Sequence, residues 1–498
     1  MKYTLGIDIG TGSVKAVAVD DQCRSFEVSQ QFYNYRSPKP GYHEQDPAEI
    51  WQAFKVVINS ITSRIGSSPM TVGLSSAMHS VIPVNEDCVA LGPMITWADN
   101  RSSEIAEGLR MTAEGMAIYE TSGTPLHAMS PLCKIIWIRE NDPVLFSRTS
   151  KFISIKEYIW YSIFHEYELD QSGASCTGLF DILNKTWNAA ALNLAGLSQK
   201  RLSKVVPNDY YRKYFNSKIS PDFDLINPGT PFVIGASDGC LANLGSMADK
   251  PGIAAITIGT SGAVRVASDR PLPNADAMTF SYILDKDTYI CGGPINNGGI
   301  ALQWWLKTTK NQLEENDYEE FFKRADTVKP GSKGLLFLPY LTGERAPVWD
   351  SESCGTFFGV RLHHNHSDFS RAVLEGICFA LKDVLDAVQQ KAEPIKQINI
   401  SGGVVRSDLW MQMLSDITDK KLVMVQSDDA SAVGAALLAM KSTGMITAYP
   451  EAPAESVRIF EPDKKNAETY AQLFGIYKQL YRNLKTTMRD LSKIAPTL

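Results

Sequence analysis

Residues 5–20 read "LGIDIGTGSVKAVAVD": an apolar strand, a Gly-Thr-Gly turn and a second apolar strand. The pattern returns at residues 255–268, "AITIGTSGAVRVAS", where the turn reads Gly-Thr-Ser-Gly. Turns of glycine, serine and threonine expose backbone N–H groups and hydroxyls with little side-chain bulk in the way. Two such hairpins, one in each half of the chain, predict two similar domains that close on one polyphosphate.

Neither hairpin fits the commoner nucleotide-binding motifs. The chain has no Gly-x4-Gly-Lys-Ser/Thr loop. The Gly10-x-Gly12 pair lacks the third glycine of the dinucleotide fingerprint, and a strand rather than a helix follows it. One hairpin alone is equally consistent with an ordinary glycine turn, but the repetition favours phosphate binding. Asp8, at the end of the first apolar strand, is placed to bind Mg²⁺ or its waters beside a phosphate.

Length and composition narrow the class of protein. With 498 residues, two or three domains are expected. The net charge of −6 argues against a nucleic-acid partner, which usually requires a basic surplus. The 8 cysteines form no C-x-x-C pair, so we expect free thiols in a reducing cytoplasm. A strand opens the chain and no apolar run reaches membrane-spanning length, so we expect a cytoplasmic protein without a leader or a membrane partner.

Strands and helices alternate along the chain, which predicts an α/β fold. A strand ends near Gly235, a small-residue helix begins near Asp238, and a break at 250–252 precedes the second hairpin. We therefore expect an N-terminal domain over 1–248 and a C-terminal domain over 249–498. The other expected helices cover 47–64 with Asp46 as N-cap, 131–142, 154–164, 367–391, 408–418, 431–440 and 462–493.

Two later segments carry glycine signals. In "SGGVVRSDLWMQMLSDIT" (401–418), a strand runs into Gly402 and Gly403 and a helix starts at Ser407 or Asp408. Paired glycines let a flat ring lie against backbone, and a helix N-terminus favours a phosphate, although a plain strand–helix turn is the alternative. In the helix over 431–440, small residues such as Gly434 leave room for close approach of a neighbouring backbone.

The whole pattern resembles the FGGY family of carbohydrate kinases. Four segments carry the resemblance: "DIGTGSVKAVAVD", "GASDGCLANLGS" (235–246), "TIGTSG", and 401–418 continuing to "DDASAVGAALLA" (428–439). The resemblance implies two actin-like (ribonuclease H-like) domains around a central cleft, with ATP and Mg²⁺ as cofactors. Asp429 departs from the family, in which Glu is frequent at this place; we expect a local packing effect only.

The resemblance also implies roles for individual residues. Asp238 matches the family's catalytic base, and a sugar hydroxyl needs one carboxylate to take its proton as it attacks phosphorus. On the residues alone, Asp238 could equally cap the following helix. Asp8 would bind the metal. The residues expected to bind ATP are Thr11, Gly12, Ser13, Lys15, Gly259, Thr260, Ser261, Gly402, Gly403 and Ser407.

Substrate choice is expected to lie in "LSSAMHSVIPVN" (74–85) and "PMITWADNRSSE" (93–104). Met78 and His79 resemble the pair in xylulokinases and gluconokinases, and "ITWADNRS" most resembles the gluconokinase branch. Asp99 would accept sugar hydroxyls, and Arg101 would pair with the carboxylate of a sugar acid. The alternatives are a core histidine bonded to backbone for His79 and a surface ion pair with Glu104 for Arg101.

We assign no catalytic role to two further loops. In "FLPYLTGERAPVWDSESCGTFFGV" (337–360), Glu344 and Arg345 are expected to pair with each other. The segment "CGGPINNGGIALQWW" (291–305) resembles the family's adenosine-side wall, with a helix entrance as an equal alternative.

The leading interpretation is phosphorylation of D-gluconate to 6-phosphogluconate. Xylulokinase is the runner-up, and another pentulose or polyol kinase comes third. An actin-superfamily chaperone or regulator would also use twin phosphate hairpins, but would lack the base and the Met-His wall. Asp8 and Asp238 speak against an inactive sugar sensor. The oligomeric state stays open, with a homodimer as one candidate.

Overall fold

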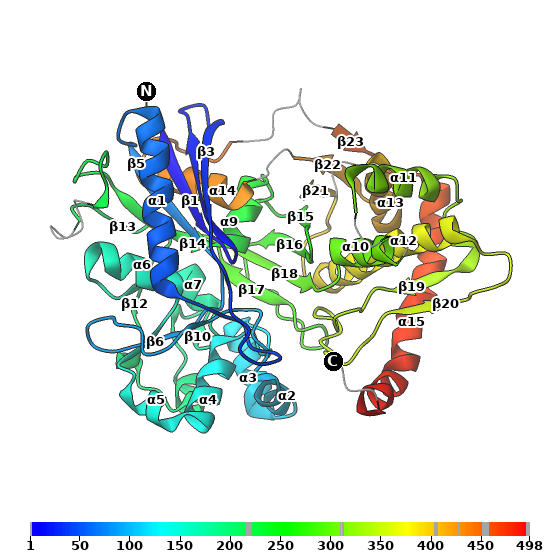
Figure 1. Cartoon of the computed structure of the whole chain (residues 1–498), viewed down its shortest axis with the longest axis horizontal. Helices are drawn as coiled ribbons and strands as arrows, with labels where there is room; N and C mark the ends of the chain where they lie inside the picture. The colour runs from blue at the N-terminus through cyan, green and yellow to red at the C-terminus, as the bar shows by residue number, and fades with distance from the viewer. Residues whose placement is uncertain are drawn as a thin grey trace.

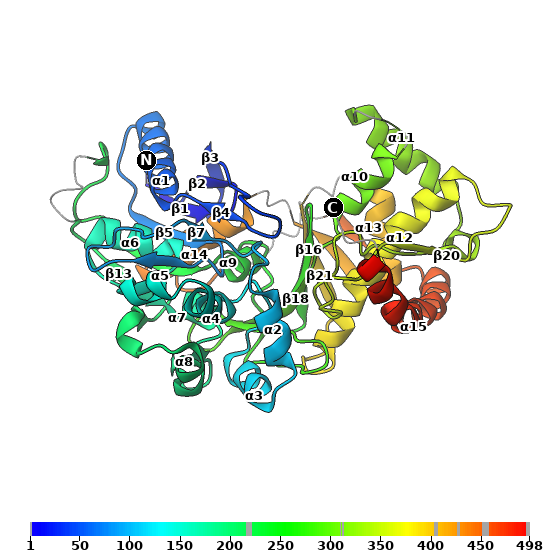
Figure 2. The same ribbon diagram turned by 60° about the horizontal axis from the view of Figure 1, so that its bottom comes forward.

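The computed structural model describes residues 2–215, 222–308, 310, 313–402, 407–425, 429–450 and 458–494. They form two α/β lobes side by side, one blue to green and the other green to red (Figures 1 and 2). Each lobe is built on one large sheet. The expected fold class, two α/β domains, is confirmed.

The sheet of the first lobe has the order β13-β14-β5-β1-β2-β3. Smaller pairs β4-β7, β6-β8, β9-β12 and β10-β11 extend this lobe. Its strands are β1 (Thr4–Ile9), β2 (Ser13–Val19), β3 (Ser25–Phe32), β4 (Glu44–Gln45), β5 (Thr71–Ser76), β6 (Ile82–Val84), β7 (Met94–Ile95), β8 (Lys151–Ile153), β9 (Glu168–Asp170), β10 (Phe180–Asp181), β11 (Thr186–Trp187), β12 (Lys204–Val206), β13 (Tyr211–Arg212) and β14 (Phe232–Ser237).

The sheet of the second lobe has the order β17-β18-β16-β15-β21-β22-β23, and β19 pairs separately with β20. Its strands are β15 (Ile253–Ile258), β16 (Gly262–Ser268), β17 (Phe280–Ile283), β18 (Tyr289–Ile295), β19 (Leu336–Leu338), β20 (Thr356–Phe358), β21 (Gln397–Ser401), β22 (Lys421–Met424) and β23 (Arg458–Phe460).

The helices follow the expected positions closely. Asp46 caps α1 through the backbone N–H of Ala48, as the sequence predicts, while Ser154, expected as the first residue of a helix, is the N-cap of α6. The helices are α1 (Pro47–Ile65), α2 (Ser103–Arg110), α3 (Ala113–Ser122), α4 (Pro131–Asn141), α5 (Pro143–Arg148), α6 (Ile155–Phe164), α7 (Gln171–Ser175), α8 (Ala189–Ala195), α9 (Asp238–Gly245), α10 (Gly299–Lys307), α11 (Glu315–Asp326), α12 (His366–Gln389), α13 (Asp408–Thr418), α14 (Ala430–Ser442) and α15 (Lys464–Ile494), with 3₁₀ turns at Gln199–Arg201 and Ser332–Gly334. Within the described ranges, no helix combines the length and apolar character needed to cross a membrane.

The cores of the two sheets repeat one topology. β1 pairs antiparallel with β2 and parallel with β5, while β15 pairs antiparallel with β16 and parallel with β21. The β1–β2 and β15–β16 turns therefore occupy equivalent positions in the two lobes. These turns hold the two phosphate-type sequences, so the sequence repeat corresponds to a structural repeat.

Helix α14, from the second half of the chain, packs on the sheet of the first lobe. In both views this orange helix lies among the blue and green elements, next to β1 and α9 (Figures 1 and 2). Its backbone comes so close that a Cβ at Gly6 of β1 would lie 1.9 Å from the Ala432 carbonyl oxygen. A Cβ at Gly434 would similarly lie 2.0 Å from the Leu241 carbonyl oxygen in α9. The small residues expected to permit close backbone approach do so, but their neighbour belongs to the other lobe.

Replacing Gly6 by Ala should destabilise the protein by about 3 kcal/mol, the upper end of the usual cost of overpacking. The physical reason is that the added methyl would force β1 and α14 apart. The midpoint of thermal unfolding should fall. Gly475→Ala, in α15, is the matched control, since no heavy atom lies within 4 Å of its added Cβ. Helix propensity should raise that midpoint slightly, so equal effects of the two substitutions would contradict the packing argument.

Candidate active site

The two equivalent turns border one cavity of about 310 Å³. Thr11 comes from the β1–β2 turn, and Gly259 and Ser261 come from the β15–β16 turn. A neighbouring cavity of about 470 Å³ shares four lining residues with it, so the two form one continuous cleft. The shared residues are Trp97, Met129, Ser261 and Arg345. Residues that are far apart in the sequence thus meet where the lobes face each other.

The first turn is held so that its hydroxyl protons remain available. The Trp97 indole Nε1–H donates to the Thr11 hydroxyl oxygen at 2.8 Å, and the Gln30 amide donates to the Ser13 hydroxyl oxygen at 2.8 Å. Because both hydroxyls accept these bonds, each can direct its own proton at an anion. Gly12 is exposed, and a Cβ there would meet nothing within 4 Å. These features fit a phosphate group beside the turn.

The second turn rests on the start of α10. The backbone N–H groups of Gly299 and Ile300 donate to the carbonyl oxygens of Gly259 and Thr260, at 2.7 and 3.1 Å. Gly259 and Thr260 are exposed. The segment 291–305 therefore acts as the support of this turn, which is the helix-entrance alternative considered from the sequence.

Asp8 lies at the cleft end of β1, on the same face of the strand as Gly6. The Ser75 hydroxyl donates to Asp8 Oδ1 at 2.7 Å, and burial raises the pKa of this carboxyl above its ordinary value. Lys15, its cross-strand partner, forms an ion pair with Asp429 at the N-terminus of α14. No group of three or more His, Cys, Asp or Glu side chains suited to a metal occurs within the described part of the chain. One carboxylate beside phosphate oxygens nevertheless suits Mg²⁺, which keeps several of its waters.

Asp238 begins α9 and lines the cavity. Its Oδ1 accepts the Gly239 backbone N–H at 2.7 Å, while the N-cap position belongs to Ser237, whose side chain makes no capping bond. Burial, followed by the charge of Asp8, raises the pKa of Asp238 to about 7, against the lowering effect of Arg265. A carboxylate of near-neutral pKa beside two phosphate turns is suited to general-base chemistry.

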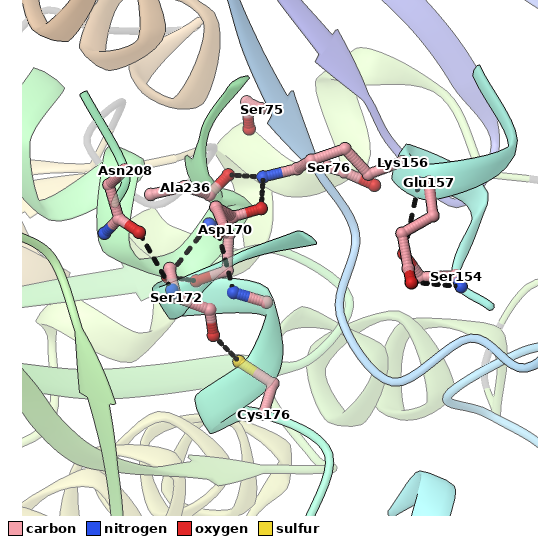
Figure 3. Close-up of polar contacts among 12 residues, drawn as sticks. Ser75, Ser76, Ser154, Lys156, Glu157, Asp170, Ser172, Cys176, Asn208 and Ala236 are labelled. Carbon is pink, nitrogen blue, oxygen red and sulfur yellow. Dashed lines mark hydrogen bonds and ion pairs between the residues drawn. The ribbon is translucent and has the colours of Figure 1, made fainter. Parts of the chain in front are cut away.

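A buried polar network holds the strand end that carries Asp238 (Figure 3). The Lys156 ammonium donates to Asp170 Oδ2 at 2.7 Å and to the Ala236 carbonyl oxygen at 2.8 Å. The Ser172 hydroxyl accepts the Ser237 backbone N–H at 3.1 Å and donates to the Ser237 hydroxyl at 2.9 Å. Lys156 and Asp170 are 4% and 0% exposed, so the ion pair is shielded from water. Sequence analysis missed this network; a charged Lys-Glu pair inside the apolar run "SIKEYIW" was its one signal.

Met78 and His79 form part of the cavity wall. His79 has a left-handed backbone (φ 68°), and its Nδ1–H donates to the Cys176 carbonyl oxygen at 2.8 Å. Burial and the nearby Lys134 lower the pKa of His79 to about 3, so the ring is neutral. His79 is therefore both a buried histidine bonded to backbone and a lining residue, which combines the two alternatives drawn from the sequence.

Ala98 and Asn100 line the cleft, whereas the side chains of Asp99 and Arg101, both expected to bind substrate, bind each other and Glu44. Neither Asp99 nor Arg101 lines either cavity. The Arg101 guanidinium donates to Asp99 and to Glu44 Oε1, at distances of 2.6 to 2.8 Å, and stacks on the Tyr42 ring. Its side chain is 7% exposed, and its acidic partners are not Glu104. Because two carboxylates already neutralise Arg101, it has little charge left for a substrate carboxylate.

Two arginines that the sequence did not assign line the cavity instead. Arg345 donates to Asn296 Oδ1 at 2.7 Å and to the Ile295 carbonyl oxygen at 3.1 Å, and its guanidinium lies over Trp97. The expected ion pair between Glu344 and Arg345 is wrong: the Glu344 carboxylate accepts the backbone N–H groups of Asn296 and Arg345. Arg265 was detectable as one charge within the apolar strand "AVRVAS".

The expected adenosine side is described in part. Gly402 directly follows β21 and has φ 101°, and a Cβ there would lie 2.5 Å from the Ile258 carbonyl oxygen. Ser407 caps α13 by accepting the Trp410 backbone N–H at 3.3 Å. Gly403 lies outside the described residues. Glycine at 402 is therefore required by close packing against β15, whatever its role towards a nucleotide.

Comparisons with known proteins agree over the full length. Residues 3–245 match the N-terminal domain, and 254–443 the C-terminal domain, of the FGGY family of carbohydrate kinases. Gluconokinase of Bacillus subtilis (strain 168) is 39% identical, with 98% of both chains covered, and xylulose kinase of Lactococcus lactis is 29% identical, with 99% of both covered. Gluconate kinase of Lactobacillus acidophilus, a solved structure, superposes with a TM-score of 0.93 at 31% identity over 99% of this chain and 100% of its own. The resemblance inferred from the four segments is confirmed.

Lys156→Met should destabilise the protein by about 3–5 kcal/mol, because it leaves the buried Asp170 carboxylate without its cation. Adding Asp170→Asn should recover most of that stability, since Asn still caps α7. The turnover number should stay low in the double variant. The Ala236 carbonyl oxygen, two residues before Asp238, would still lack the hydrogen bond that the Lys156 ammonium donates to it. Recovery of both stability and turnover would show that Lys156 only stabilises the fold.

Proposed function

We propose that this chain, which belongs to the FGGY family of carbohydrate kinases and is a phosphotransferase, phosphorylates D-gluconate at its terminal hydroxyl to give 6-phosphogluconate. The observation that carries the kinase chemistry is a single cavity lined by Asp238 and by both phosphate-type turns. The choice of gluconate is supported by full-length similarity to gluconokinases of Bacillus subtilis and Bacillus licheniformis, at 39% and 38% identity.

In this proposal Asp238 accepts the proton of the acceptor hydroxyl as that oxygen attacks the terminal phosphorus. The carboxylate must be ionised to do so, and the Lys156–Asp170–Ala236 contacts hold its strand end in place. Met78 and His79 line the wall on which the sugar lies, and the neutral imidazole has Nε2 as an acceptor, 3.4 Å from the Tyr282 hydroxyl. Closure of the lobes would exclude water, which otherwise competes as phosphoryl acceptor.

Kinases of this family use ATP, and the two turns offer suitable groups for its phosphates. We assign Thr11, Gly12 and Ser13 from one lobe and Gly259, Thr260 and Ser261 from the other. Asp8 would hold Mg²⁺, which neutralises charge on the phosphate oxygens when bound. The adenosine side would involve Gly402, Gly403 and Ser407. Lys15 is engaged by Asp429, so we assign it to orienting the first turn near the phosphates.

A xylulose kinase is the second candidate, and specific comparisons favour keeping it. A ligand-bound structure titled xylulose kinase, also from Lactobacillus acidophilus, superposes with the same TM-score of 0.93 and the same 31% identity as the gluconate kinase structure. Fold similarity therefore does not separate the two acceptors, and the distinction depends on the side chains that line the cavity.

Asp238→Asn should lower kcat by about 10²- to 10⁴-fold, the usual contribution of a positioned base. In the unsubstituted protein, kcat/KM should fall as the pH drops through about 7, because protonation of the carboxyl removes the base. That acid limb should be absent from the residual activity of the variant. Asp490→Asn, on the exposed face of α15, is the control and should change neither quantity. A variant that keeps more than a tenth of the activity would remove Asp238 from the catalytic role.

Among neutral and acidic acceptors, D-gluconate should show the highest kcat/KM. The measurement is ADP release coupled to a dehydrogenase assay, with D-gluconate, D-xylulose, D-ribulose and glycerol compared at equal Mg²⁺-ATP. The physical reason is that two guanidinium groups, those of Arg265 and Arg345, line the cavity and can bind a carboxylate. A higher kcat/KM for D-xylulose would replace gluconokinase by xylulokinase within the same family.

A further inference from the structure

Arg265 and Arg345 enter the cavity that holds Asp238 from two separate elements of the second lobe. Arg265 lies in the middle of β16, opposite Gly292 of β18. Arg345 lies in the loop between β19 and β20. Both belong to the lobe opposite Met78, His79 and Asp238, so a sugar on the first lobe would face two guanidinium groups.

Neither guanidinium has a carboxylate within 4.0 Å among the described residues, whereas Arg101 has two. Arg265 has one weak neutral contact, from Nη1 to the Thr257 hydroxyl at 3.5 Å. Arg345 donates to two neutral oxygens, which fix its orientation, and the nearby Glu344 carboxylate offsets part of its charge without a direct ion pair. Burial lowers the pKa of both groups, that of Arg345 to about 10, which expresses the cost of keeping the two charges there. An anion bound between them would offset this cost.

The place of Arg265 indicates which anion it meets. A Cβ added to Gly239 would lie 3.2 Å from both Arg265 Nε and Met78 Cε, so the arginine lies beside the sugar wall and next to the residue after the base. Its strand begins at Gly262, after the phosphate turn has ended. The side chain therefore lies beside Met78 and the start of α9, within the cavity that both turns border.

We propose that Arg265, with Arg345 beside it, binds the carboxylate of an open-chain sugar acid and makes Arg265 the residue that selects acids over neutral sugars. This inference rests on the proposed function. It assigns to Arg265 the role that the sequence suggested for Arg101. A guanidinium presents paired N–H donors that match the two oxygens of a carboxylate, and a neutral acceptor of the same shape cannot use its charge.

The test compares D-gluconate with D-gluconamide, which replaces the carboxylate by a neutral amide of nearly the same shape. In the unsubstituted protein, kcat/KM should be about 10²-fold higher for gluconate, the discrimination expected of a charge-assisted bidentate contact. In Arg265→Met this ratio should fall to within about threefold of one. The ratio is the readout because loss of Arg265 also raises the pKa of Asp238 and slows both acceptors alike.

Arg101→Met is the matched control and should keep the ratio of the unsubstituted protein. Arg265→Lys retains the positive charge without the paired N–H donors of a guanidinium, so it should restore part of the preference for gluconate over gluconamide. This variant provides the measurement if Arg265→Met does not fold. A ratio that stays near 10² in the Arg265 variants would overturn the inference, as would a ratio that collapses in Arg101→Met instead. Equal loss for both acceptors, with a raised KM for ATP, would place Arg265 on the transferred phosphoryl group.

Failure of the proposed function looks different. If the unsubstituted protein prefers D-xylulose and shows no preference for gluconate over gluconamide, the gluconate assignment fails and the carboxylate site fails with it. If gluconate is preferred but the preference survives Arg265→Met, the proposed function stands and only this inference is lost.

Discussion

Backbone-to-backbone packing of α14 against the first sheet is the contact on which the rest of the arrangement depends. The helix reaches β1, β5 and α9 across positions where a Cβ would overlap a carbonyl oxygen, at Gly6, Gly73, Gly245 and Gly434. Because α14 lies in the chain between β22 and β23 of the second sheet, this contact ties the second half of the sequence to the first lobe. The same contact allows Asp429 to form an ion pair with Lys15, which is the cross-strand partner of Asp8. The strand that presents the metal-binding candidate is thus held by a helix whose sequence lies more than four hundred residues away.

Buried charge is the second organising feature of the cleft. Asp8 and Asp238 lie on the first lobe. Burial raises the pKa of each, and the charge of Asp8 raises the pKa of Asp238 further. Lys156 and Asp170 form a buried ion pair. The Lys156 ammonium also donates a hydrogen bond to the carbonyl oxygen of Ala236, at the end of the strand that precedes Asp238. Arg265 and Arg345 on the second lobe have no carboxylate within 4.0 Å among the described residues, although the charges of Asp238 and Glu344 act on them. A kinase has reason to keep such charges, because its substrates supply phosphate and, in our proposal, a carboxylate.

The contrast between Arg101 and Arg265 shows how ion pairing decides a function that residue type alone leaves open. Both are arginines in segments next to the cleft. Arg101 is neutralised by Asp99 and Glu44 and stacks on Tyr42, so it braces the loop around β4 and β7. Arg265 projects from a sheet into the cavity, and among the described residues the Thr257 hydroxyl lies at the edge of its hydrogen-bond range. The difference lies in which partners the fold brings within 4 Å, and those partners are 57 residues away in the case of Glu44.

The sequence by itself determined the two hairpins, the helix starts at Asp46 and Ser154, and the family, because these depend on local turn chemistry, capping and short contiguous motifs. It also identified Asp238 and Asp8 as carboxylates at strand ends. Only the tertiary structure decided that α14 packs on the first lobe, that Lys156 supports the strand end before Asp238, and that Arg265 rather than Arg101 faces the cavity. Those outcomes depend on contacts between distant segments and on whether a buried charge meets a counter-charge, which neither periodicity nor spacing along one chain records.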